Sequence, residues 1–339
     1  MPNRFDPRDL AVPVIAAPMA GGPSTPELAA AAGNAGGLGF VAAGYLSADA
    51  LAERVVAARN LTTGPLGVNL FVPQPSAATP EAIEAYAAAL APDAERYGVA
   101  LGDPVYTDDD WAAKVEVLLD LRPEVASFTF GLPSAEECRR LREAGIATVG
   151  TVTSVGEAEA AIECGVDAIA VQGPAAGGHR GTFDPVAEPN PQPLKDLLTA
   201  VVGRFGGPVM AAGGLMSAED ISAVIDAGAV AAQLGTAFLL ADEAGSSPVH
   251  RKALQDSQFT ETAVTRSFSG RYARGLRNRF IDDHEAQAPF GYPEIHYLTG
   301  PLRAGSVRAG DPHATNVWAG TGFKSIRAGS VAEILGSLT

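Results

Sequence analysis

The chain has 339 residues, of which 47% are hydrophobic, and its formal net charge is -15. A chain of this length and apolar content can bury a large core, either as one large domain or as two ordinary ones. The negative charge leaves no broad positive field, so we expect neither nucleic acid nor an anionic membrane surface as a partner.

The cysteine pattern and the lengths of the apolar runs predict where the protein is located in the cell. Cys138 and Cys164 lie in helix-like segments without the spacing of metal ligands, so we expect free thiols and no metal site. Residues 1–9 are polar, and no run of about 18 apolar residues occurs. We therefore expect a cytoplasmic protein without a membrane span.

Short apolar runs alternate with alanine-rich helical segments along the first 240 residues. Strands are expected at residues 12–17, 38–42, 66–71, 126–130, 148–152, 168–171, 209–212 and 229–234, and helices at 25–35, 48–60, 134–144, 154–164, 193–204 and 217–227. The alternation pauses at residues 73–123, which hold two helical segments, 80–96 and 108–121, and which we interpret as an insertion near the third unit.

Eight strands with intervening helices match the size of a closed parallel (β/α)8 barrel. An open doubly wound sheet is the alternative, and the strand count disfavours it. We expect an α/β TIM barrel over residues 1–240 with the helical insertion at 73–123. A C-terminal extension over residues 241–339, with helices at 249–256 and near 330–335, is expected to pack around the barrel or its mouth.

Glycine-rich turns follow the seventh and eighth strands, at residues 211–215 and 233–237. In barrels of this kind, backbone N–H groups in these two loops often hold a phosphate group. Each turn taken alone is better explained as an ordinary tight turn than as a phosphate site. The two together favour a phosphate-bearing cofactor.

One histidine follows the sixth strand. His179 comes after several small residues, where glycine lets the backbone approach a bound group, and imidazole suits proton transfer or the electrostatic support of an anion. An isolated histidine is more often structural, but this position at a strand end favours a functional role. We interpret the histidines of the tail as surface residues: His250, His284, His296 and His313.

Other residues at strand ends have two interpretations. Asn69 and Gln172 are polar residues in apolar runs and need partners if they are buried, which either a ring carbonyl or imide or a neighbouring strand can supply. Pro18 and Met19 follow the first strand, where they form an apolar platform against a flat ring or simply turn the chain.

Taken together, these segments resemble the nitronate monooxygenases, formerly called 2-nitropropane dioxygenases. The matching segments are Ala17-Pro18-Met19, residues 36–39, Gly67-Val68-Asn69, Gln172-Gly173, residues 176–179, 211–214 and 233–236, and, in the tail, residues 270–280 and 318–320. The resemblance thus spans nearly the whole chain.

The resemblance implies an FMN-dependent TIM barrel that oxidises alkyl nitronates or nitroalkanes, such as propionate 3-nitronate, with O2. It implies His179 as the catalytic residue facing the substrate. It also implies a set of FMN contacts: Pro18, Met19, Ala20, Asn69, Gln172, Gly177, Gly178, Gly213, Gly214, Gln233, Gly235 and Thr236.

The chain departs from the family pattern at two places. Ala175 stands where the family usually has a glutamate, and the substrate-facing tyrosines of the family are not matched to particular residues among Tyr106, Tyr272, Tyr292 and Tyr297. We expect a small-molecule substrate and either a monomer or a homodimer. The alternatives are an NAD(P)H-dependent flavin reductase acting on a quinone or an enoyl thioester, and a non-catalytic flavin-binding protein, against which His179 argues.

Overall fold

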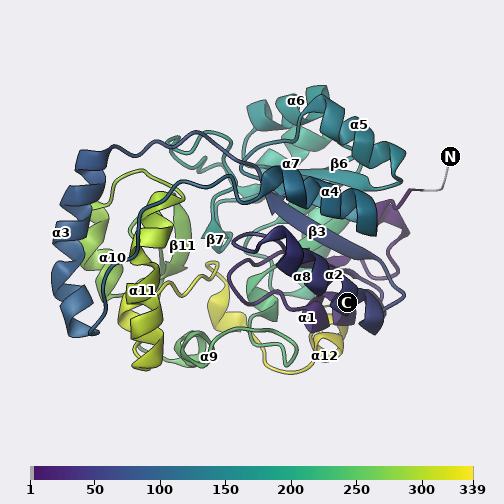
Figure 1. Ribbon diagram of the computed structural model, residues 1–339. Coiled ribbons are helices and arrows are strands. Elements are labelled where there is room, and N and C mark those ends of the chain that lie inside the picture. Colours follow the sequence, from purple (N-terminus) through teal and green to yellow (C-terminus); the bar gives the residue numbers. More distant parts are fainter. Residues whose placement is uncertain (1–3, 339) are drawn as a thin grey trace.

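The computed structural model describes residues 4–338 and forms a closed barrel of eight parallel strands (Figure 1). The barrel strands, in order, are β1 (Val14–Ala16), β2 (Leu38–Ala42), β3 (Leu66–Phe71), β4 (Val125–Thr129), β5 (Ala147–Val152), β6 (Ala168–Gln172), β8 (Val209–Ala212) and β9 (Ala231–Leu234). The barrel closes at β1, where Ile15 pairs with Leu38 on one side and with Gln233 on the other. The predicted (β/α)8 fold is confirmed.

Apolar side chains fill the inside of the barrel and the layer outside it. Ile15, Phe40, Val149 and Met210 belong to one buried cluster contributed by strands around the whole barrel. The strand residues that alternate with them, such as Val41, pack against the surrounding helices. The strands are therefore buried on both faces, which explains their nearly continuous apolar sequence.

Among the described residues, eight helices surround the barrel. They are α1 (Pro26–Asn34), α2 (Ala48–Leu61), α4 (Trp111–Leu121), α5 (Ala135–Glu143), α6 (Val155–Cys164), α7 (Leu194–Val202), α8 (Ala218–Asp226) and α12 (Val331–Gly336). Capping boxes at Ser134, Ser217 and Ser330 start α5, α8 and α12. The last helix, α12, packs against α1, so the end of the chain returns to the barrel.

The second lobe, which we define as α3, α9, β10, β11, α10 and α11, lies beside the barrel (Figure 1). Its bounds are α3 (Pro80–Arg96), α9 (Pro248–Gln255), β10 (Thr262–Thr265), β11 (Ala273–Leu276), α10 (Arg279–His284) and α11 (Glu294–Arg308). Tyr86, Phe268, Ile295 and Leu302 form part of its core. The two helices expected in the insertion lie apart, because α3 packs against α11 whereas α4 packs between α2 and α5.

A two-residue strand joins the barrel to the second lobe. β7 (Gly178–His179) lies in the loop after β6 and pairs antiparallel with β11, where His179 is opposite Ala273. The resulting three-stranded sheet has the order β10-β11-β7. The loop that carries His179 is thus an edge strand of the second lobe.

Short elements and the thiols complete the fold. Single 3-10 turns are η1 (Pro7–Asp9), η2 (Thr236–Phe238), η3 (Glu285–Gln287), η4 (Pro312–Ala314) and η5 (Phe323–Ser325). Cys138 and Cys164 are free, as predicted, although their Sγ atoms are 3.5 Å apart. None of the helices within residues 4–338 has the length and apolar character needed to cross a bilayer.

Candidate active site

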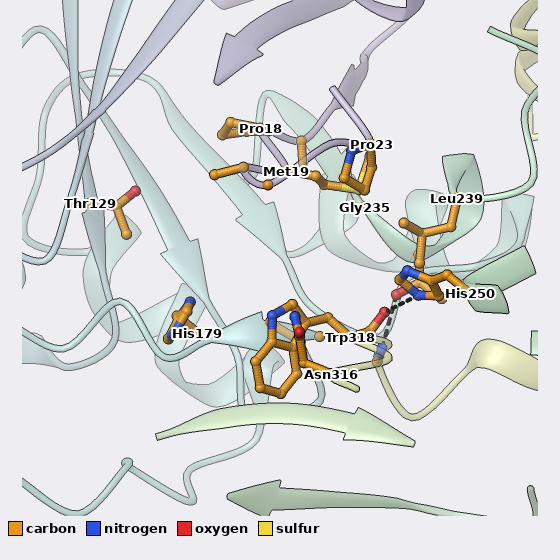
Figure 2. A pocket seen from close by; sticks show the side chains of 18 of the residues that line it. Pro18, Met19, Pro23, Thr129, His179, Gly235, Leu239, His250, Asn316 and Trp318 are labelled. Atoms are coloured by element: carbon orange, nitrogen blue, oxygen red, sulfur yellow. Dashed lines mark hydrogen bonds between the residues drawn. The ribbon is translucent and has the colours of Figure 1, made fainter. Parts of the chain in front are cut away.

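A cavity of about 630 Å³ lies at the carboxyl ends of the barrel strands, and residues of the second lobe also line it. Figure 2 shows Pro18, Met19 and Gly235 on one side of this space and His179 and Trp318 on another. The cavity brings together every residue predicted for the site: Pro18, Met19, Ala20, Asn69, Gln172, Gly177, Gly178, His179, Gly213, Gly214, Gln233, Gly235 and Thr236.

The turns after β8 and β9 present free backbone amides to the cavity. The N–H groups of Gly213, Gly214 and Gly235 form no hydrogen bond with any residue in the described range. Gly213 has a φ of +109°, and a Cβ there would lie 3.0 Å from the carbonyl oxygen of Gly173. Gly214 also has a positive φ, of +80°, so both positions after β8 favour glycine. The bare amides of all three glycines fit an anionic group such as a phosphate.

The two polar strand residues have different roles. The Asn69 amide nitrogen lies 2.9 Å from the Ser127 hydroxyl, 3.1 Å from the Thr129 hydroxyl and 3.2 Å from the Ser127 carbonyl, all of which can accept from it. These contacts fix the side-chain orientation, and within residues 4–338 nothing donates to its Oδ1. Gln172 uses both ends of its side chain, since it donates to the His179 carbonyl at 3.0 Å and accepts from Gly181 N at 2.9 Å. Gln172 therefore holds the His179 loop in place.

Ser269 lies beside one nitrogen of the His179 ring. Its hydroxyl oxygen is 2.9 Å from His179 Nε2 and 3.2 Å from the Arg271 carbonyl, which can only accept. With the hydroxyl proton directed to that carbonyl, Nε2 donates to Ser269, and Nδ1 has no hydrogen-bond partner among the described residues. Burial, together with the positive charges of Arg271 and Arg303, lowers the pKa of His179 to about 3, so the ring is neutral at physiological pH.

Aromatic side chains from both parts of the molecule surround His179. The ring centroids of Phe130, Tyr292 and Trp318 lie 5.8, 5.5 and 5.6 Å from that of His179. Further along the same wall, Tyr45 stacks on His296 with a centroid distance of 4.0 Å. These rings make the wall of the cavity around His179 largely apolar.

Tyr45 is held in a strained conformation by a buried ion pair. Its φ is +69°, and its N–H donates to Asp109 Oδ1 at 3.0 Å. Lys114, which is buried, lies 2.7 Å from Asp109 Oδ2 and donates to the carbonyl of Ala43 at 3.0 Å. Burial raises the pKa of Asp109, while Lys114 opposes that shift. The loop before α4 thus positions one wall of the cavity.

The interpretation of the tail histidines as surface residues is wrong for three of them. His250 and His296 line the cavity, and His284 is buried beside Asp93 at 2.7 Å. His250 donates from Nε2 to the Trp318 carbonyl at 3.0 Å, and burial lowers its pKa to about 4 (Figure 2). The tail packs across the carboxyl face of the barrel, so its polar residues face the cavity.

The electrostatic character of the cavity is opposite to that of the whole protein. Arg303 and Arg308 of α11 line it, whereas no aspartate or glutamate among residues 4–338 does so. The chain as a whole has 39 acidic and 24 basic residues other than histidine. The cavity therefore favours anionic groups.

A barrel with free amides after its last two strands and a neutral histidine over its carboxyl face is typical of TIM-barrel enzymes with a site suited to an anionic group. The family model for nitronate monooxygenase matches residues 8–339. The chain belongs to the nitronate monooxygenase family and is a flavin-dependent oxidoreductase.

Individual relatives and solved structures are similar over most of their length. A probable nitronate monooxygenase of Staphylococcus aureus strain MSSA476 is 38% identical over 317 residues, which cover 91% of this chain and 88% of the relative. A crystal structure of nitroalkane oxidase from Streptomyces ansochromogenes is 45% identical with a TM-score of 0.95, and the match covers 98% of this chain and 96% of that one. FabK from Thermotoga maritima is 25% identical with a TM-score of 0.73, covering 98% and 93%.

Sequence reasoning missed the residues that the second lobe contributes. Ser269 and Arg303 line the cavity and were not singled out, His296 was interpreted as a surface residue, and Trp318 entered only through the family resemblance of residues 318–320. Tyr45 had a usable signal, because it follows the carboxyl end of β2 by three residues, where barrel enzymes place functional groups. The others become visible only when the packing of the lobe is known.

Proposed function

We propose that the protein is an FMN-dependent monooxygenase that oxidises alkyl nitronates and neutral nitroalkanes with O2. The observation that carries this proposal is the neutral His179, whose Nδ1 lone pair is free, in a cavity that also holds the free amides of Gly213, Gly214 and Gly235. Membership of the family and the similarity to a nitroalkane oxidase support it.

The cavity residues fit FMN by the chemistry of their free groups. The three glycine amides are suited to the phosphate, and the free Oδ1 of Asn69 is suited to accept from the imide N–H of the flavin ring. Pro18 and Met19 offer an apolar surface to the ring. When bound, FMN accepts electrons from the substrate and passes them to O2.

His179 is assigned the transfer of the substrate proton. Because Ser269 holds the proton of the ring on Nε2, Nδ1 can accept a proton from the carbon that bears the nitro group. A nitronate has already lost that proton, so its oxidation does not need this step. The surrounding rings exclude water and hold the substrate against the proposed base.

The test replaces the histidine and separates the two kinds of substrate. His179→Asn is expected to retain FMN, to lose about 100-fold or more of its turnover of nitroethane, and to lose less with ethyl nitronate, since general-base catalysis contributes about 100- to 10,000-fold. His313→Asn, at a histidine outside the cavity lining, is the matched control. Unchanged turnover of nitroethane in His179→Asn would remove the histidine from this role.

A flavin reductase that uses NAD(P)H is the second candidate, and the similarity to FabK over nearly the whole chain favours it. The two functions differ in what reduces the flavin. In anaerobic mixing, the monooxygenase proposal requires a nitronate to bleach the flavin absorbance. Bleaching by NADPH within seconds, with no response to the nitronate, would instead support the reductase.

A further inference from the structure

The two cysteines of the chain meet in the outer layer of the barrel. Cys138 lies on α5 and Cys164 is the last residue of α6, and both helices pack against β5 and lie next to each other in Figure 1. Their Sγ atoms are 3.5 Å apart, although the residues are 26 positions apart in the sequence. Neither residue lines the cavity at the carboxyl ends of the strands. The pair is therefore a feature separate from the proposed active site.

Hydrogen bonds direct the two sulfur atoms toward each other. The Cys164 thiol donates to the carbonyl of Pro133 at 3.2 Å, which leaves its sulfur as the acceptor for the thiol of Cys138. Pro133 directly precedes Ser134, the N-cap residue of α5, so the start of one helix holds the thiol of the other. A disulfide bond of about 2 Å requires the sulfurs to approach by roughly 1.5 Å, which is a movement of side chains and not of whole helices.

The two thiols differ in their access to solvent. Cys138 is 1% exposed, and burial raises its pKa to about 12, so on its own it is a poor target for a dissolved oxidant. Cys164 is half-buried and can be reached from the solvent. Redox-sensing cysteines are accessible and often stand beside a second, resolving cysteine. Cys164 thus has the place of the attacked thiol and Cys138 that of the resolving thiol.

We propose that Cys138 and Cys164 form a reversible disulfide when the protein meets hydrogen peroxide or an organic hydroperoxide. The Cys164 thiolate first attacks one oxygen of the peroxide, so that an S–O bond forms, the O–O bond breaks and the other oxygen takes up the thiol proton and leaves as water or an alcohol. The sulfur of Cys138 then attacks this sulfenic sulfur. The S–S bond forms, the S–O bond breaks, and the hydroxide leaves with the Cys138 proton as water.

The electrons of this reaction balance without any group of the active site. The two sulfurs lose two electrons, which the peroxide gains, and a dithiol reverses the reaction by exchange. The bond would stop the oxidation of Cys164 at a reversible stage, because a sulfenic acid without a resolving thiol is oxidised further to a sulfinic acid. It would also join the helices on the two sides of β5 and restrict the unfolded chain. The inference is independent of the proposed function.

The first test counts thiols in the wild-type holoenzyme, where the chain has two cysteines and the count reports on this pair alone. The protein is treated with hydrogen peroxide, unfolded, alkylated with N-ethylmaleimide and weighed by mass spectrometry. We expect a monomer that has lost two hydrogens and carries no maleimide, and that regains both alkylated thiols after dithiothreitol. Two free thiols under conditions that oxidise glutathione, a sulfinic acid at Cys164, or a disulfide only between two chains would each overturn the inference.

Single substitutions test the order of attack. In Cys138→Ala, the same treatment is expected to add two oxygens to Cys164, because no thiol resolves its sulfenic acid. In Cys164→Ala, the buried Cys138 is expected to stay unmodified. Oxidation of Cys138 in Cys164→Ala as fast as that of Cys164 in Cys138→Ala would refute the assigned order. FMN content and thermal unfolding of both variants show whether they have folded.

An equilibrium measurement on the wild type tests the geometry and needs no variant. The pair is equilibrated with reduced and oxidised glutathione, and the ratio [GSH]²/[GSSG] at half-oxidation is determined in buffer and in concentrated urea. A fold that brings the sulfurs together holds the disulfide against a ratio at least about 10-fold higher in buffer than in urea. An equal or lower ratio in buffer would show that the fold does not favour the bond and would overturn the inference. No nitro compound is used, so this result and the fate of the proposed function are distinguishable.

Discussion

The low pKa of His179 makes a sharp prediction for the pH dependence of turnover with nitroethane. With a pKa of about 3, more than 95% of the imidazole stays neutral from pH 7 down to pH 5. A histidine with the ordinary pKa of about 6.5 would fall from about 76% to about 3% neutral over the same range, a loss of about 25-fold. We therefore expect kcat/KM for nitroethane to change less than about 2-fold between these pH values.

The assay is oxygen consumption by the holoenzyme with freshly dissolved nitroethane, which stays neutral in this range. Activity is measured from pH 5 to pH 8 at constant ionic strength. Ethyl nitronate, whose oxidation does not need the base, serves as the reference substrate at each pH. An acid limb with a midpoint near pH 6.5 for nitroethane alone would show that His179 is not held neutral by burial and by Arg271 and Arg303, and would refute the reasoning.

The same pKa has a consequence for stability. His179 in the unfolded chain binds a proton near pH 6.5, whereas in the folded protein it does so near pH 3. The unfolded chain therefore binds more protons between these values, and stability is lost as the pH falls through this window. The limiting slope is about 1.4 kcal/mol per pH unit, an upper value because the ring faces a cavity. Urea unfolding of wild type and His179→Asn between pH 4 and pH 7 measures the difference.

Three further substitutions test individual contacts. Ser269→Ala removes the acceptor of His179 Nε2, and we expect turnover of nitroethane to fall about 5- to 30-fold, for a hydrogen bond worth about 1–2 kcal/mol, with recovery in Ser269→Thr. Gly213→Ala places a side chain at a φ of +109°, so we expect FMN to bind at least about 10-fold more weakly in a fluorescence titration. Lys114→Met leaves the buried Asp109 without its cation and should lower the free energy of unfolding by about 3–5 kcal/mol, measured in urea, whereas the double change with Asp109→Asn should lower it less.

The barrel could be predicted because its sequence signals are local and repeated. Apolar runs such as residues 66–71 coincide with their strands, and the helix expected at 154–164 ends at Gly165, which has a left-handed φ of +80°. Barrel sites lie at the carboxyl ends of the strands. This rule leads one to expect Asn69, His179 and Gly213 in one cavity, and all three line it. Their individual roles remain predictions.

The wall of the second lobe could not be predicted in this way. Arg303 and Ser269 have local partners on their own segments, but their position on the cavity wall depends on how α11 and the turn between β10 and β11 pack across the barrel face. The sequence around Lys114 is typical of a surface position on an amphipathic helix. In the structure this lysine is only 1% exposed, and it forms an ion pair with Asp109 at 2.7 Å. Such contacts are set by tertiary packing, which local propensity does not encode.

The pairing of β7 with β11 couples the position of His179 to that of the second lobe. His179 belongs by sequence to the barrel, but its backbone is an edge strand of the sheet in the second lobe, and Ser269 of that lobe holds its ring. Any rotation of the lobe relative to the barrel therefore moves the proposed base together with Arg303, while the glycine amides after β8 and β9 stay with the barrel. Such a rotation would change the distance between the proton acceptor and whatever those amides hold.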